Sequence, residues 1–138
     1  MFEKLVVALD ASKHAGPVLS AAAELASKFE SEVRVLHVVE MSIPARTGQG
    51  SHEEDSEAQK LLDDAVATLQ SHGVAATSSL SSAPHGKVAG MISDEARQWG
   101  ATAIITGTRG LSDLEGILVG STTHKLLHLT QLPVLVVH

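Results

Sequence analysis

The sequence has no cysteine and almost no aromatic residues. Without cysteine the chain can form no disulfide, no thiolate metal site and no thiol nucleophile, a composition compatible with a reducing compartment. We therefore expect a cytoplasmic protein. Only Phe2, Phe29 and Trp99 are aromatic although 43% of the residues are hydrophobic, so the core must be packed mainly with Val, Leu, Ile and Ala.

An excess of positive charge and a long apolar run are also missing. The formal net charge of -6 argues against a nucleic-acid partner, because contacts to a phosphate backbone depend on Lys and Arg. The N-terminal apolar run, Leu5 to Leu9, is too short for a signal peptide or a membrane span, so we expect no membrane association. A length of 138 residues suits one domain, residues 1–138.

Apolar runs alternate with segments of helical periodicity. Strands are predicted at 4–9, 33–39, 74–80, 102–106 and 133–137, and helices at 17–31, from about 58 to 69, from Pro84 onward and at 117–129 with an interruption near Gly120. Gly73 stands where a left-handed helix cap is expected, and Met41 to Ser51 is predicted as a loop. The alternation predicts an α/β fold with a parallel sheet and helices on both faces.

The candidate binding segment follows the fourth predicted strand. It reads Thr-Gly-Thr-Arg-Gly from Thr106 to Gly110 and continues, after nine residues, with Gly-Ser-Thr-Thr from Gly120 to Thr123. Glycines permit positive φ and let a ligand approach the backbone, while a helix start offers free N–H groups to an anion. A phosphate chain is the ligand this pattern favours. The alternative is that Gly107 and Gly110 only shape a turn and Ser121 only caps a helix.

Two better-known phosphate loops are missing. The sequence has neither the G-x-x-x-x-G-K-[ST] loop nor a G-x-G-x-x-G after the first predicted strand. A P-loop NTPase and a dinucleotide oxidoreductase are therefore disfavoured.

The spacing of Gly107, Gly110, Gly120 and Ser121 resembles the nucleotide motif of the universal stress protein family, in its ATP-binding branch. The likeness extends over the whole chain, from Val-Ala-Leu-Asp-Ala-Ser around Asp10, through Leu-His-Val in the second strand, to the closing Leu-Pro-Val-Leu-Val-Val. It implies an α/β fold with a five-stranded parallel open sheet of order 3-2-1-4-5, Rossmann-like and similar to the adenine nucleotide alpha-hydrolases. Nucleotide would lie where the first and fourth strands part.

The resemblance also implies roles for individual residues. Asp10 would contact the nucleotide or its Mg²⁺, with a helix cap as the alternative role. For the apolar residues Ala8, Leu9 and Val38, the alternative role is ordinary packing in the core. The residues expected to bind ATP are Ala8, Leu9 and Val38 around adenine, Asp10, then Thr106, Gly107 and Gly110 near ribose and phosphates, and Gly120, Ser121, Thr122 and Thr123 at the phosphates.

Other residues are predicted to have structural or surface roles. His37 lies inside a strand and is expected to be a core histidine with a hydrogen-bond partner, while His124 and His128 are expected on a solvated helix face. The apolar strand Val134 to Val137 would lie at a sheet edge, which invites pairing. The resemblance implies a homodimer in which two copies of this strand pair antiparallel.

Three functions are open on the sequence alone. The leading one is an ATP-binding regulator or sensor of the stress response. The second is a slow, Mg-dependent ATPase or phosphotransferase using Asp10, although the sequence offers no evident general base and no P-loop Lys for fast phosphoryl transfer. The third is a nucleotide-free dimeric interaction module. No catalytic residue is assigned.

Overall fold

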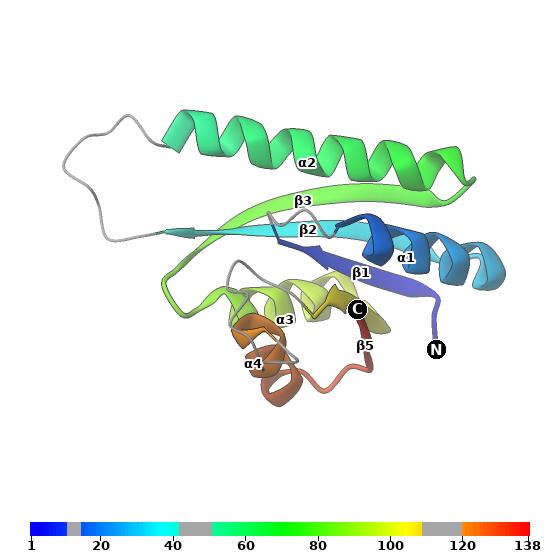
Figure 1. Cartoon of the computed structure of the whole chain (residues 1–138). Helices are drawn as coiled ribbons and strands as arrows, with labels where there is room; N and C mark the ends of the chain where they lie inside the picture. Colours follow the sequence, from blue (N-terminus) through cyan, green and yellow to red (C-terminus); the bar gives the residue numbers. More distant parts are fainter. Residues whose placement is uncertain (11–14, 42–50, 109–119) are drawn as a thin grey trace.

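The computed structural model describes residues 1–10, 15–41, 51–108 and 120–138, and the side chains of 51–54 are not described. Five strands and four helices alternate along these residues, as the sequence predicts (Figure 1). The elements are β1 (Lys4–Leu9), α1 (Ala15–Phe29), β2 (Glu32–Met41), α2 (Ser51–Ser71), β3 (Ala75–Pro84), α3 (Val88–Trp99), β4 (Ala103–Gly107), α4 (Ser121–Leu129) and β5 (Val134–Val137).

The strands form one parallel sheet of order β3-β2-β1-β4-β5. β1 lies at its centre, with Leu5 opposite Val33 of β2 and Ala103 of β4. The order 3-2-1-4-5 and the parallel pairing expected from the resemblance are confirmed. β5 pairs only with β4 among the described strands, so it forms one edge of the sheet and β3 forms the other.

The sheet is packed on both faces because β1 and β4 are continuously apolar. α1 and α2 cover one face, where Leu5, Val7 and Ile105 are fully buried, and α3 and α4 cover the other (Figure 1). None of the helices within the described residues is long and apolar enough to cross a bilayer. The two faces together bury almost all of the Val, Leu and Ile side chains of the central strands.

The end of α2 is predicted correctly and the start of α3 is not. Gly73 has φ +77° just after α2, the left-handed conformation that glycine adopts without a Cβ penalty. Pro84 does not open a helix. It is the last paired residue of β3, opposite Met41, and α3 begins only at Val88 after a turn in which Gly86 has φ +77°. Proline is tolerated there because β3 is an edge strand.

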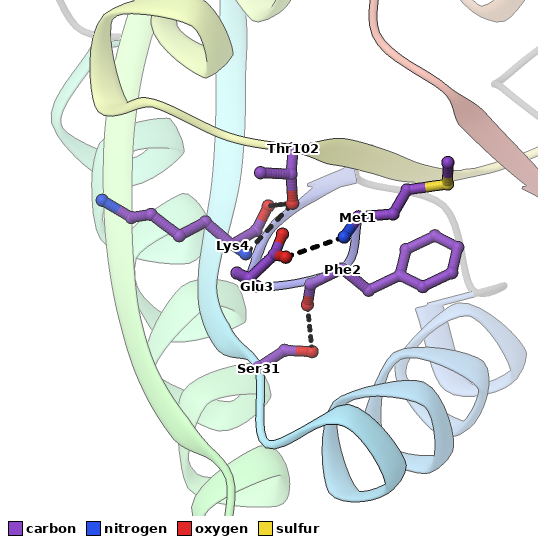
Figure 2. A network of polar contacts seen from close by, with 6 residues as sticks. All are labelled: Met1, Phe2, Glu3, Lys4, Ser31 and Thr102. Carbon is purple, nitrogen blue, oxygen red and sulfur yellow. Dashed lines mark hydrogen bonds and ion pairs between the residues drawn. The ribbon is translucent and has the colours of Figure 1, made fainter.

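The first residues of the chain are tied to the starts of two other segments (Figure 2). The Lys4 backbone N–H donates to Thr102 Oγ1 at 3.1 Å, and the Thr102 hydroxyl donates to the Lys4 carbonyl at 3.0 Å. The Ser31 hydroxyl donates to the Phe2 carbonyl. The N-terminal ammonium of Met1, 2.7 Å from Glu3 Oε1, lowers the pKa of the Glu3 carboxyl. These contacts fix the start of β1.

Candidate functional site

The predicted binding segment lies at the carboxyl ends of β1 and β4. Ala8 is opposite Thr106, so the two strands end side by side. From this point the chain continues to β2 on one side of β1, while β4 and β5 extend the sheet on the other. Ligands of open α/β sheets bind in the crevice at such a reversal of strand order.

Three hydrogen bonds join the end of β4 to the start of α4 and to the last strand. The Thr123 hydroxyl donates to the Gly107 carbonyl at 2.9 Å, and the Gly120 N–H donates to the Thr108 carbonyl at 2.8 Å. The Thr108 N–H in turn donates to the Val137 carbonyl at 2.9 Å. The His124 N–H closes the first turn of α4 on the Gly120 carbonyl at 2.9 Å. The amino end of α4 is therefore held beside the end of β4.

Thr108 and Thr123 are both buried, which explains why these bonds matter. Thr108 is 5% exposed and Thr123 is 6% exposed, so a hydroxyl or amide there needs a partner within the chain. The Thr123 hydroxyl uses its only proton on Gly107 and can offer a ligand only an acceptor. Thr108 is not predicted as a site residue from the motif spacing, although its position between Gly107 and Gly110 is a signal for it.

Neither of the described motif glycines, Gly107 and Gly120, has an unusual torsion angle. Gly107 has no positive φ, and Gly120 has φ -61° and ψ 157°, which any residue adopts. A Cβ on Gly107 would lie 3.3 Å from Val18 Cγ2, so glycine lets α1 pack tightly against the end of β4. The expectation of positive φ is wrong for these two residues, and for Gly107 the close approach of Val18 is the remaining reason.

The start of α4 has no side-chain cap among the described residues. Gly120 is its N-cap, and Ser121 is the first helical residue, so the alternative role of Ser121 as a cap does not hold. Ser121 is exposed and Thr122 is partly exposed. Uncapped first-turn amides with hydroxyls beside them form the kind of group that binds an anion at a helix N-terminus.

The sheet divides the apolar candidates between its two faces. Ala8 and Val38 lie with Leu36 in the cluster on the α3–α4 face, whereas the Leu9 side chain packs in the α1–α2 cluster. Consecutive strand residues point to opposite faces, so Leu9 can border the same ligand as Ala8 only through its backbone. Thr106, opposite Ala8, is buried as well.

Asp10 and His37, which lie in or beside the central strands, differ in their exposure to solvent. Asp10 follows β1 directly and is exposed. Gly110 falls outside the described residues. His37 is buried, and its Nδ1 is 2.8 Å from the Leu9 carbonyl oxygen. A carbonyl only accepts, so Nδ1 carries the proton, and the predicted core histidine with a partner is confirmed.

His124 and His128 meet on the outer side of α4. Their ring centroids are 4.9 Å apart in an edge contact, and both side chains are exposed. No group of three metal-ligating side chains occurs within the described ranges. The pair is adequately explained as a ring contact on a solvated helix face.

Known proteins resemble this chain along its entire length. The profile of the universal stress protein family matches residues 1–138. The chain belongs to this family. A universal stress protein of Bacillus subtilis, YxiE, is 31% identical over 150 aligned positions that cover 99% of each chain.

Solved universal stress proteins share the fold. One from Burkholderia pseudomallei is 30% identical with a TM-score of 0.78, over 98% of this chain and 95% of that one. One from Archaeoglobus fulgidus, in complex with dAMP, is 27% identical with a TM-score of 0.76, over 100% of both chains. The universal stress protein fold and the family membership expected from the motif spacing are thus confirmed.

Proposed function

We propose that this universal stress protein binds an adenine nucleotide, ATP, at the carboxyl ends of β1 and β4, and that it acts as a cytoplasmic, nucleotide-dependent regulator or sensor of stress. The observation that carries the proposal is the joining of β4 to α4. The Thr123 and Gly120 hydrogen bonds hold an uncapped helix N-terminus next to two strand ends at the point where the strand order reverses. Helix N-termini in this setting bind phosphate groups.

Two further observations support an adenine nucleotide. The Archaeoglobus fulgidus relative was solved with dAMP, an adenine nucleotide with one phosphate. In this chain the buried side chains of Ala8 and Val38 would supply apolar contacts beside the same strand ends. ATP rather than AMP is proposed because the motif extends over Gly120, Ser121 and Thr122, and Asp10 at the end of β1 would then approach the Mg²⁺ that accompanies the phosphates.

The test is calorimetric titration of the nucleotide-free protein with adenosine, AMP, ADP and ATP, with and without Mg²⁺. If α4 holds phosphates, affinity should increase with each added phosphate, because each brings further charge-assisted hydrogen bonds worth about 1.5–3 kcal/mol. Chromatography and mass spectrometry of the denatured protein should identify the nucleotide that co-purifies. Equal affinity for adenosine and ATP would contradict a phosphate site. Absence of binding by all four would favour the nucleotide-free interaction module.

We also propose a homodimer formed through β5. This strand is a sheet edge, and its Leu135 side chain is 45% exposed, a large apolar group to leave in water. A second copy of the strand, antiparallel across a two-fold axis, would extend the sheet and cover Leu135 on both chains.

Replacing Leu135 by lysine is expected to convert the dimer to a monomer, because two ammonium groups would face each other across the axis. Sedimentation equilibrium should give twice the chain mass of 14.4 kDa for the wild type and the chain mass for the variant. The matched control is Leu80→Lys on β3, at the other edge of the sheet, where Leu80 is 36% exposed. If Leu135→Lys stays dimeric, the interface lies elsewhere.

A further inference from the structure

A cavity that is open to solvent lies along α3, beside Arg34 of β2. Its volume is about 470 Å³, and it is lined by Arg34, Met91, Asp94, Glu95, Gln98 and Trp99. Arg34 comes from β2 and all the other lining residues come from α3.

This cavity is separate from the proposed nucleotide site. Arg34 is near the start of β2 and Trp99 is the last residue of α3, so the cavity lies toward the amino ends of the strands. Val38, the β2 residue assigned to the nucleotide site, is four residues further along the strand, or about 13 Å at the usual strand rise. A ligand of the cavity would therefore contact different residues.

Trp99 has two cations on its indole ring. The Arg34 Cζ lies 4.6 Å from the ring centroid and the Lys4 Nζ lies 4.4 Å from it. Lys4 Nζ also donates to the Trp99 carbonyl at 2.9 Å, and Figure 2 shows this side chain extended away from Met1 and Glu3. These two positive groups stand at one ring, while Asp94 and Glu95 bring two carboxylates to the same cavity.

Arg34 has no acceptor for its N–H groups among the described residues. Its Nε is shielded from solvent and lacks a hydrogen-bond partner, and the guanidinium forms no ion pair within the described chain. A buried polar group without a partner is destabilising and calls for an explanation. Arg34 as a whole is only partly buried, so a carboxylate would bind its terminal nitrogens and not the shielded Nε.

The two acidic residues of the cavity are engaged elsewhere. Glu95 accepts hydrogen bonds from Ser79, at 3.0 Å, and from Ser81, both on β3. Asp94 pairs with Arg97 at 3.3 Å on the exposed side of α3. Neither carboxylate forms an ion pair with Arg34 within the described residues, although both line the same cavity.

We propose that this cavity binds a small organic acid that carries a hydroxyl or amino group. Its carboxylate binds the Arg34 guanidinium beside Trp99, and its second polar group donates to the carboxylate of Asp94 or to the side-chain oxygen of Gln98. Met91 supplies the apolar contact for the carbon skeleton. The inference rests on the contacts of Arg34 and Trp99 and does not depend on nucleotide binding.

Intrinsic fluorescence tests the proposal because Trp99 is the only tryptophan of the chain. Titration with sodium L-malate or L-alanine should give a saturable change for at least one of them. Sodium chloride at equal ionic strength should give none, and inorganic phosphate should bind more weakly. The single indole N–H resonance in a proton–nitrogen NMR spectrum should shift along the same curve. A response that is linear in every salt, or equal for phosphate, would overturn the proposal.

Two charge-removing variants locate the binding. Arg34→Gln should weaken binding at least about tenfold, because a charge-assisted hydrogen bond is lost. Lys60→Gln removes a positive charge from α2, on the other face of the sheet, where the side chain is exposed, and should leave the affinity unchanged. Equal affinity in both variants would refute the assignment. If circular dichroism shows that Arg34→Gln is unfolded, Arg34→Lys is tested in its place. An affinity of Arg34→Lys equal to that of the wild type would refute binding of the carboxylate by the guanidinium.

Discussion

Replacement of Gly120 by valine is expected to lower the affinity for ATP about 100-fold while the protein stays folded. Gly120 has φ -61° and ψ 157°, a conformation that valine adopts readily, and its N–H bond to the Thr108 carbonyl can persist. The added isopropyl group would stand at the start of α4, where the phosphates are proposed to reach the first-turn amides. Loss of two charge-assisted hydrogen bonds of about 1.5 kcal/mol each gives the predicted factor.

Calorimetry with ATP measures this loss, and thermal unfolding followed by circular dichroism checks the fold. Gly90→Val in α3 is the matched control, because Gly90 has no positive φ and a Cβ there meets nothing within 4 Å. It should bind ATP like the wild type. If folded Gly120→Val also binds ATP like the wild type, the motif glycine only shapes the loop, and the proposed function fails.

The sequence predicts the sheet well because its signal is local. β1 and β4 are short apolar runs, and a strand buried on both faces needs such a run, as Leu5, Val7, Ile104 and Ile105 show by being fully buried. The start of α3 is mispredicted because proline often opens helices. Here the pairing of β3 with β2 up to Pro84, a tertiary interaction, delays the helix to Val88.

For the candidate site, the sequence predicts where the motif residues lie in the fold better than it predicts their contacts. Gly107 ends β4 and Ser121 begins α4, while ligand binding there stays a prediction. The buried role of Thr108 depends on Val137, a residue of β5 distant in sequence. The separation of Ala8 from Leu9 follows from strand alternation and could have been predicted. The contact between Arg34 and Trp99 could not have been predicted from the sequence, because it requires α3 to lie on β2.

Two adjacent leucines of α4 should differ sharply when each is replaced by alanine. Leu126 is 1% exposed and packs with Ala8, Leu36 and Ile104, whereas Leu127 is 46% exposed. Leu126→Ala should lower the free energy of unfolding by about 3 kcal/mol, since it removes buried methyl groups and leaves a cavity. That is a large part of a typical stability of roughly 5–15 kcal/mol and corresponds to a melting temperature lower by roughly 10 °C.

Leu127→Ala is the matched control, with the same atoms removed one residue further along the same helix. Its free energy of unfolding should stay within about 0.5 kcal/mol of the wild type, because its side chain is largely in water already. Chemical denaturation at low protein concentration compares the two variants. Equal destabilisation would contradict this prediction and would mean that a second chain covers the outer face of α4, so that the dimer interface includes the helix as well as β5.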